Sequence, residues 1–217
     1  MNYFCEIIII LYMLTILKNN REFELRGNRS FLRTENEMCC VDKNEADSAL
    51  KLYKKEFIDT LLKLKGFLKY KTNAYVRRNQ VDVLEYIDLQ KEKNGSRTFT
   101  VNYGLTALYI PRKFFNWDYN QRLGMLICKK DIWWDFANDT IAKVSFENVA
   151  KAIEEFVIPW FDARSNDDSI KKMLLDDREK YGWSPYKQAW LEAIDHRCNL
   201  SETIEKNIKL FKLPKSL

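Results

Sequence analysis

The chain has 217 residues, of which 46% are hydrophobic and 31% are charged, so it can form a folded core and is not a disordered or low-complexity protein. Six glycines and four prolines exclude a collagen-like or linker-rich chain, and the single histidine, His196, excludes most histidine-based chemistry. The net charge of +5 arises from 36 basic and 31 acidic residues, which is no nucleic-acid signature by itself. At about 150 residues per domain, one domain with appendages is expected.

The amino terminus carries an apolar run at 3–17, which is followed by basic residues. The run is shorter than the ~20 residues of a transmembrane helix, and it contains Glu6. It also lacks the preceding positive charge and the small-residue cleavage site of a signal peptide. We expect residues 1–37 to lie outside the folded domain, with Met38 or Met13 as the natural start. A membrane anchor formed by residues 3–17 is the alternative.

The cysteines indicate a reducing compartment. They are Cys5, Cys39, Cys40, Cys128 and Cys198. Their number is odd, no C-x-x-C pair occurs, and two of them are adjacent, which is typical of reduced thiols in the cytoplasm rather than of disulfides. A zinc site built on His196 and Cys198 would lack two further ligands, so no metal and no cofactor is predicted.

The first half of the domain has clear hydrophobic periods. Apolar residues recur at helical spacing over 46–64, with lysines largely on the opposite side. Gly66 follows at the position of a left-handed C-cap and predicts the end of this helix. The period then changes to two, which predicts strands at 68–77, 81–89 and 99–105. The dipeptide Asn94-Gly95 predicts a hairpin turn before the third strand.

The second half is less regular. Between 110 and 144, the segments 123–128 and 132–136 are expected to be short strands or a covering loop. A helix is predicted at 146–160, with Ser145 as its N-cap and Pro159 as a kink or an early end. Three further helices are expected at 170–181, from Pro185 (after Ser184 as N-cap) towards His196, and at 201–211. The whole order predicts an α+β fold with an N-terminal helix, an antiparallel β-sheet of at least three strands and C-terminal helices.

Six segments carry a familiar pattern: FIDTLLKLKGFL (57–68), YVRRN (75–79), VDVLEYIDLQ (81–90), FTVNYG (99–104), DIWWDF (131–136) and IPWFD (158–162). In this order they resemble the bacterial domain-of-unknown-function family 4304. The resemblance implies a small α+β domain of bacterial cytoplasmic proteins, and it brings no established activity or catalytic residues to transfer. Members commonly begin shortly before the first helix, which supports an N-terminal extension here. We therefore expect a single α+β domain at 38–217, with a family-like core at 50–165 and a helical part at 166–217.

Catalytic motifs are missing from the sequence. G-x-x-x-x-G-K-[ST], G-x-G-x-x-G and G-x-S-x-G do not occur. His196 stands in a predicted charged helix, which favours an exposed or capping histidine. Adjacent acidic residues at 154–155, 167–168 and 176–177 point in different directions on a helix and favour a solvated surface. No catalytic residue is predicted, and an enzyme without a recognisable motif is the second alternative for the function.

The first candidate binding surface is aromatic. Six tryptophans enrich the second half of the chain, and interface hot spots favour Trp, Tyr and Arg. Adjacent Trp133 and Trp134 would point to opposite faces of a strand, so one of them can lie near Arg122 or Asp131 at the surface. The predicted partner-binding residues are Trp117, Arg122, Asp131, Trp133 and Trp134.

The second candidate surface is basic. Residues 51–78 hold nine basic and two acidic residues, whereas 145–181 hold nine acidic and six basic ones. Surfaces of opposite sign favour a protein partner or self-association. The basic face is expected to comprise Lys63, Lys65, Lys69, Lys71, Arg77 and Arg78. Because aromatic residues are interleaved with it, this face also suits nucleic acid.

The leading functional hypothesis is a non-enzymatic cytoplasmic domain that binds a protein partner. An immunity-like or defence-associated role follows only by analogy with other small bacterial domains. Nucleic-acid binding through the basic face at 51–78 is the first alternative.

Overall fold

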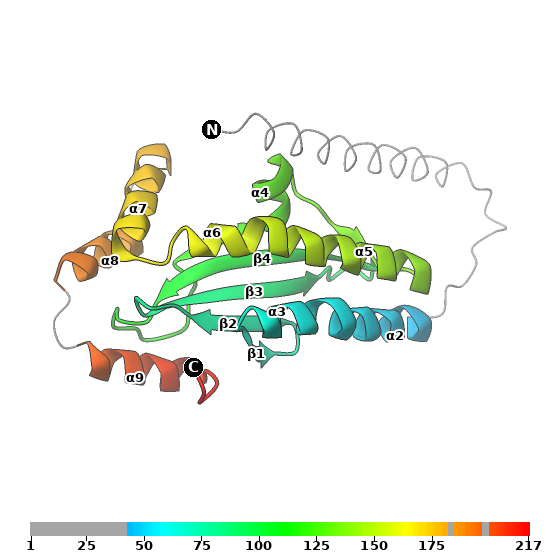
Figure 1. The fold of residues 1–217 in the computed structure, drawn as a ribbon, viewed down its shortest axis with the longest axis horizontal. Helices are drawn as coiled ribbons and strands as arrows, with labels where there is room; N and C mark the ends of the chain where they lie inside the picture. Colours follow the sequence, from blue (N-terminus) through cyan, green and yellow to red (C-terminus); the bar gives the residue numbers. More distant parts are fainter. Residues whose placement is uncertain (1–42, 182–184, 197–199) are drawn as a thin grey trace. The chain divides into compact units, whose positions relative to one another are not determined.

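A six-stranded antiparallel sheet lies at the centre of the computed structural model, which describes residues 43–181, 185–196 and 200–217 (Figure 1). Its strands are β1 (Leu68–Lys71), β2 (Ala74–Arg78), β3 (Val83–Lys91), β4 (Thr98–Ala107), β5 (Tyr119–Arg122) and β6 (Trp134–Asp135). Strands β1 to β5 are neighbours in sequence order, and β6 pairs with the start of β4. The long strands β3 and β4 therefore form the middle of the sheet.

Two long helical stretches cover one face of the sheet. The first stretch consists of α2 (Lys43–Tyr53), the π-helical segment η1 (Lys54–Asp59) and α3 (Thr60–Leu64). The second stretch consists of α5 (Asp139–Ala152), the π-helical segment η2 (Ile153–Val157) and α6 (Ile158–Asp162). Helices α2 and α5 pack against each other. From β4, the ring of Phe99 stacks on Phe146 and that of Tyr103 packs edge-on against Trp160, with centroids 4.6 and 5.0 Å apart. Because side chains alternate along a strand, every second residue of β4 is buried under this helical layer.

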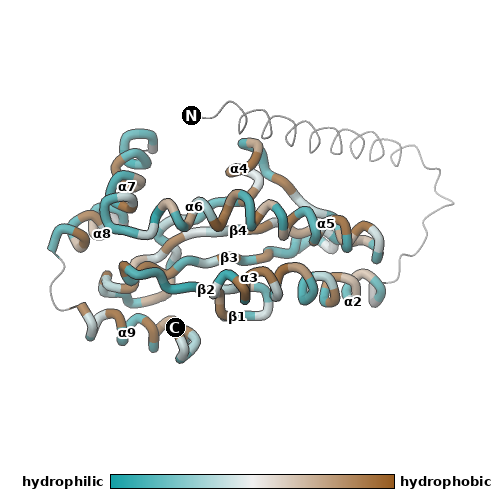
Figure 2. The backbone as a smooth tube through the Cα atoms, in the orientation of Figure 1, coloured by the Kyte–Doolittle hydropathy of each residue, from teal (hydrophilic) through white to brown (hydrophobic). Residues whose placement is uncertain are grey.

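The opposite face is partly covered by the loop after β4 and by α9 (Ser201–Phe211). Phe115 of the loop packs edge-on against Phe211, with ring centroids 4.7 Å apart. The buried amide of Asn207 donates hydrogen bonds to the backbone oxygens of Leu108 and Ile110, at 2.8 and 2.7 Å. Hydrophobic and hydrophilic residues alternate along α9 in Figure 2, as expected for a helix with one side packed on a core.

Three more helices complete the described chain: α4 (Leu123–Cys128), α7 (Asp167–Tyr181) and α8 (Pro185–Asp195). Trp190 of α8 is fully buried, and its indole N–H donates to the hydroxyl of Tyr109 at 2.7 Å. An exposed ion pair between Lys171 and Asp195 joins α7 to α8 at 2.6 Å. Among the helices described, none combines the length and the apolar character needed to span a membrane.

The predicted α+β fold is confirmed, including the first helix, the antiparallel strands and the C-terminal helices. Gly66 and Gly95 adopt the left-handed conformation that their predicted positions require, with φ values of +80° and +82°. The predicted strand at 68–77 is instead the β1–β2 hairpin, because the chain turns at Thr72 and Asn73. The ammonium of Lys54 binds the Thr72 oxygen at 2.7 Å and Asn73 Oδ1 at 2.9 Å, and burial lowers the pKa of this lysine.

The predicted start of the long second helix and its predicted early end at Pro159 are wrong. The helix begins at Asp139, because the side chain of Asn138 accepts a hydrogen bond from the Ile141 amide at 2.9 Å and caps the first turn. Ser145 is buried inside the helix rather than at its end. Pro159 does not end the helix, since the π-helical turns of η2 precede it and accommodate its missing N–H.

The segment 123–128 is helix α4 rather than a strand or a loop. Leu123 and Ile127, one helical turn apart, are both buried, and Lys129 ends the helix in the left-handed conformation with φ of +60°. The predictions for residues 1–37 and for Ser184 lie outside the described residues.

Candidate functional site

Three of the predicted partner-binding residues meet at the edge of the sheet. Arg122 is the last residue of β5, and its guanidinium forms an ion pair with Asp131. The same guanidinium lies over the ring of Trp133, 5.1 Å from the ring centroid. The side chains of Arg122 and Asp131 remain 35% and 41% exposed, so the group is open to solvent. We call Arg122, Asp131 and Trp133 the Arg122 cluster.

Helix α4 brings the parts of this cluster together. The chain leaves Arg122, makes the short helix and returns along residues 129–133. Gly124 at the start of α4 allows this return, because a Cβ there would lie 2.4 Å from the Lys130 oxygen and 2.7 Å from the Ile132 nitrogen. A side chain at position 124 would therefore push Asp131 and Trp133 away from Arg122.

A row of polar side chains continues from the cluster across the sheet. Arg122 pairs in register with Asn102 of β4, and the Asn102 amide donates to Gln90 Oε1 at 3.0 Å and to Asp88 Oδ2 at 3.4 Å. We call Asp88, Gln90, Asn102 and Arg122 the polar row. Burial raises the pKa of Asp88, although the Asn102 hydrogen bond and the charge of Lys71 oppose this.

Thr100 adds a buried hydroxyl beside the row. It pairs with Gln90 in the β3–β4 register, and its Oγ1 has no hydrogen-bond partner among the residues that the structure describes. Buried hydroxyl groups without a hydrogen-bond partner are uncommon in folded proteins, because leaving such a group unsatisfied costs about 1–3 kcal/mol of stability. The sequence did contain a signal for the row: polar residues alternate with apolar ones at 88 and 90 of β3 and at 98, 100 and 102 of β4.

The other two predicted tryptophans lie elsewhere. Trp134 pairs in register with Phe99, and the two ring centroids are 6.1 Å apart at the helix-covered face. Trp117 stacks on Tyr86 and meets the edge of Phe115, next to α9. The adjacent residues Trp133 and Trp134 therefore lie in different environments: Trp133 lies beside Arg122, and Trp134 packs against the core.

Most of the predicted basic face is paired with carboxylates. The ion pairs are Lys65–Glu154 (2.8 Å), Lys69–Asp59 (2.9 Å), Arg77–Glu85 (2.5 Å), Arg77–Asp162 (3.3 Å) and Arg78–Asp82 (2.5 Å). Lys71 lies over the Tyr70 ring at 4.8 Å, and Lys63 is exposed on α3. Strand neighbours Arg77 and Arg78 point to opposite faces. The six residues therefore do not form one continuous cationic surface.

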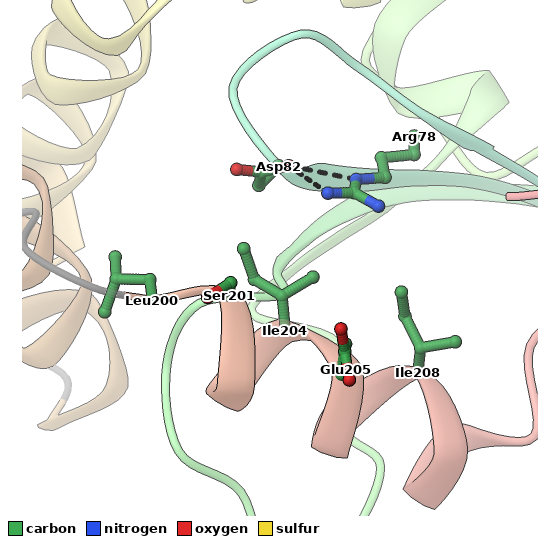
Figure 3. A pocket seen from close by; sticks show the side chains of 7 residues that line it. All are labelled: Arg78, Asp82, Leu200, Ser201, Ile204, Glu205 and Ile208. Carbon is green, nitrogen blue, oxygen red and sulfur yellow. Dashed lines mark hydrogen bonds and ion pairs between the residues drawn. The ribbon is translucent and has the colours of Figure 1, made fainter.

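Arg78 lines a pocket of about 420 Å³ between the β2–β3 turn and α9 (Figure 3). Its Nε and Nη2 both bind Oδ1 of Asp82, whose backbone is left-handed with φ of +58°. The facing side of α9 supplies Glu205 together with the aliphatic residues Ile204 and Ile208. Because the carboxylates of Asp82 and Glu205 outnumber the single guanidinium of Arg78, this pocket is poorly suited to binding phosphate.

The described part of the chain contains no side-chain cluster suited to metal or thiol chemistry. No group of three or more His, Cys, Asp or Glu side chains there could hold a metal ion. Cys128 is a free, half-buried thiol whose Sγ lies 3.5 Å from the Gly124 oxygen. Cys198, the proposed neighbour of His196 in a zinc site, lies outside the described residues.

Comparison with known families gives one match. Residues 58–163 match the family model described as Domain of unknown function (DUF4304). The comparisons with curated proteins and with solved structures gave no match. The matched segment contains the sheet, the Arg122 cluster and the polar row, and it ends before α7.

Proposed function

Residues 58–163 belong to the DUF4304 family, which has no assigned activity, and we propose from the site itself that this domain binds a protein partner through the Arg122 cluster and the polar row. The module is non-enzymatic and acts in the cytoplasm of a bacterium. Its role is immunity-like or defence-associated, by analogy with other small bacterial domains.

The observation that carries the proposal is the convergence of Arg122, Asp131 and Trp133 at a partly exposed edge. Tryptophan and arginine dominate the energetics of protein interfaces. The stacking and the ion pair already hold both large side chains in place, so a partner would lose little conformational entropy in binding them. The polar row beside them offers donors and acceptors for the rim of such an interface.

The cytoplasmic part of the proposal rests on the cysteine pattern and on the free thiol of Cys128. The bacterial part rests on the family resemblance. No convergent set of acidic, basic and nucleophilic side chains supports an enzyme within the described residues.

Alanine variants test the proposal. The tagged protein, Arg122→Ala and Trp133→Ala are expressed in the organism of origin, and co-purifying proteins are quantified. Hot-spot truncation costs about 2 kcal/mol or more, so we expect a stoichiometric partner of the unchanged protein to fall about thirtyfold in affinity. Lys151→Ala, which removes an exposed ion pair with Glu147 on α5, is the matched control and should retain the partner. Equal recovery by all four proteins, or a clean monomer without any partner, would contradict the proposal.

Nucleic-acid binding is less favoured, because four of the six predicted basic residues are engaged by carboxylates. Labelled single- and double-stranded DNA and RNA should show no micromolar binding at low salt. Four phosphate contacts on a single strand would instead give a slope of about −3 in log affinity against log salt. Such a slope, lost when Lys69, Lys71 and Arg77 are changed to Glu, would replace our proposal with the nucleic-acid one.

A further inference from the structure

Three elements meet at the C-terminal end of α9. Phe115, in the loop after β4, packs against Phe211 of α9 with ring centroids 4.7 Å apart and against Tyr70 of β1 with centroids 6.1 Å apart. The hydroxyl of Tyr70 also donates a hydrogen bond to the backbone oxygen of Phe211 at 2.7 Å. These contacts join β1, the loop and α9 into one surface.

Two large apolar side chains of this surface are exposed to solvent. Phe114 precedes Phe115 and is 61% exposed, and Leu210 precedes Phe211 and is 41% exposed. Because neighbouring Cα atoms are only about 3.8 Å apart, both residues lie close to the junction of the three elements. Exposed side chains of this size add little to the core, and their transfer from water into an apolar phase is favourable.

Six lysines accompany these two side chains. None of the six lies within ion-pair distance of a carboxylate among the residues that the structure describes. The segments that carry them, 67–78, 110–117 and 206–217, contain no acidic side chain. The lysines are Lys71, Lys113, Lys206, Lys209, Lys212 and Lys215. We call them, together with Phe114 and Leu210, the α9 patch.

An anionic membrane surface fits this combination better than a folded partner or a nucleic acid does. The negative surface of a bilayer attracts lysines without a fixed geometry, and the apolar layer beneath it accepts inserted side chains. All six cations are lysines, whereas geometric recognition of a carboxylate or a phosphate favours the bidentate guanidinium of arginine. Leu210 also offers no aromatic ring on which a nucleic-acid base could stack.

We propose that the α9 patch docks the protein on an anionic membrane surface, with Phe114 and Leu210 inserted among the lipid headgroups. This docking is peripheral, and it does not require the apolar run at 3–17. Strands β1 and β5 lie at opposite edges of the sheet path, and Arg122 is the last residue of β5. A docked protein therefore keeps the Arg122 cluster open to a protein partner.

Co-sedimentation of the full chain with lipid vesicles tests the proposal. Vesicles with about 30% phosphatidylglycerol in phosphatidylcholine are compared with vesicles of phosphatidylcholine alone. One lysine near an anionic surface strengthens binding about fivefold, so three lysines in contact predict about a hundredfold tighter binding to the anionic vesicles. Raising the salt from about 0.1 M to about 1 M shortens the Debye length from ~10 to ~3 Å and should release the protein. Equal binding to both kinds of vesicle, as insertion of residues 3–17 alone would give, would overturn the proposal.

Two double variants locate the docking surface. Lys113→Glu with Lys209→Glu removes two cations and should weaken binding to the anionic vesicles about 25-fold or more. Phe114→Ser with Leu210→Ser removes the inserted side chains and should weaken it about tenfold or more. All four residues are exposed, so the thermal unfolding of both variants should stay close to that of the unchanged protein.

The matched control is Lys63→Glu with Leu64→Ser. These residues of α3 are also an exposed lysine and an exposed leucine, but they lie in the helical layer on the other face of the sheet. The control should bind the anionic vesicles as the unchanged protein does. Unchanged binding in either patch variant, or an equal loss in the control, would overturn the assignment. Tighter binding to poly-L-glutamate or to labelled RNA than to the vesicles would assign the patch to an acidic protein or a nucleic acid instead.

Discussion

Asp88, a residue of the polar row, makes the stability of the folded protein depend on pH. Burial raises the pKa of its carboxyl, because the ionised form loses hydration that Asn102 and Lys71 only partly replace. The folded state therefore binds this proton more tightly than the unfolded state does. The stability contributed by Asp88 is complete below the unfolded pKa near 3.8 and declines as the pH rises through the folded value.

Replacing Asp88 by Asn removes this pH dependence while keeping the shape of the side chain. We expect Asp88→Asn to be more stable than the unchanged protein at pH 7, where the wild-type carboxylate is ionised. The difference should shrink towards zero as the pH falls below about 3.8. Urea unfolding across this range measures it, with Asp176→Asn on the exposed side of α7 as the control. A difference that is independent of pH would show that burial of the charge is not the cause.

At the scale of the elements, the approach of β5 to β4 depends on Gly104. A Cβ at this position would lie 2.0 Å from the Tyr119 oxygen and 2.5 Å from Cε1 of Tyr86. The backbone oxygen can move only if β5 moves, and Arg122 stands at the end of β5. The glycine therefore connects the packing of the sheet to the geometry of the Arg122 cluster.

We predict that Gly104→Ala lowers the free energy of unfolding by about 3 kcal/mol or more and weakens partner binding. Gly95→Ala is the informative comparison, because it meets no atom within 4 Å but has φ of +82°. It should cost only the ~1–2 kcal/mol of a left-handed alanine and leave the partner bound. Urea unfolding measures the loss of unfolding free energy in both variants. Similar losses in Gly104→Ala and Gly95→Ala would contradict the role of close approach at Gly104.

Elements with strong local signals were predictable, whereas those set by distant partners were not. The periods at 46–64 and 99–105 and the glycines at 66 and 95 are local, and the structure confirms them. The β1–β2 turn depends on Lys54, which reaches it from another element, so no local period marks it. The start of α5 was missed because Asn138 follows a segment without a clear period.

The candidate site was predictable only in part. Arg122, Asp131 and Trp133 were singled out by residue type, and alternation separated Trp133 from Trp134. Nothing in the sequence distinguishes Trp117 from Trp133, because the difference depends on which of them packs against Tyr86. The polar row required the register between β3 and β4, which the sequence does not specify.

On the scale of the whole molecule, the two segments of opposite charge bind each other. Lys65 and Arg77 of the basic segment pair with Glu154 and Asp162 of the acidic one. These contacts are largely exposed and contribute at most ~1 kcal/mol each. The charge asymmetry seen in the sequence is thus partly satisfied within the chain, and the protein-binding proposal does not depend on it.

A chain that begins at Met38 should fold as stably as the full chain, because the apolar period of the first helix starts at Ala46 in the sequence. Thermal unfolding of both proteins measures this. A midpoint lower by many degrees in the shorter chain would show that the apolar run at 3–17 contributes to the core. Partition of the full chain into neutral membranes would instead establish that run as an anchor.

Site-specific photo-crosslinking tests the central claim most directly, namely that the Arg122 cluster touches a protein partner. A photoreactive residue is placed at exposed Lys130, next to Asp131, and in a second protein at Val144, which is 53% exposed on α5. Our account predicts one discrete adduct, heavier than the 26.0 kDa chain, from position 130 and none from position 144. An adduct from position 144 alone, or none from position 130, would contradict it.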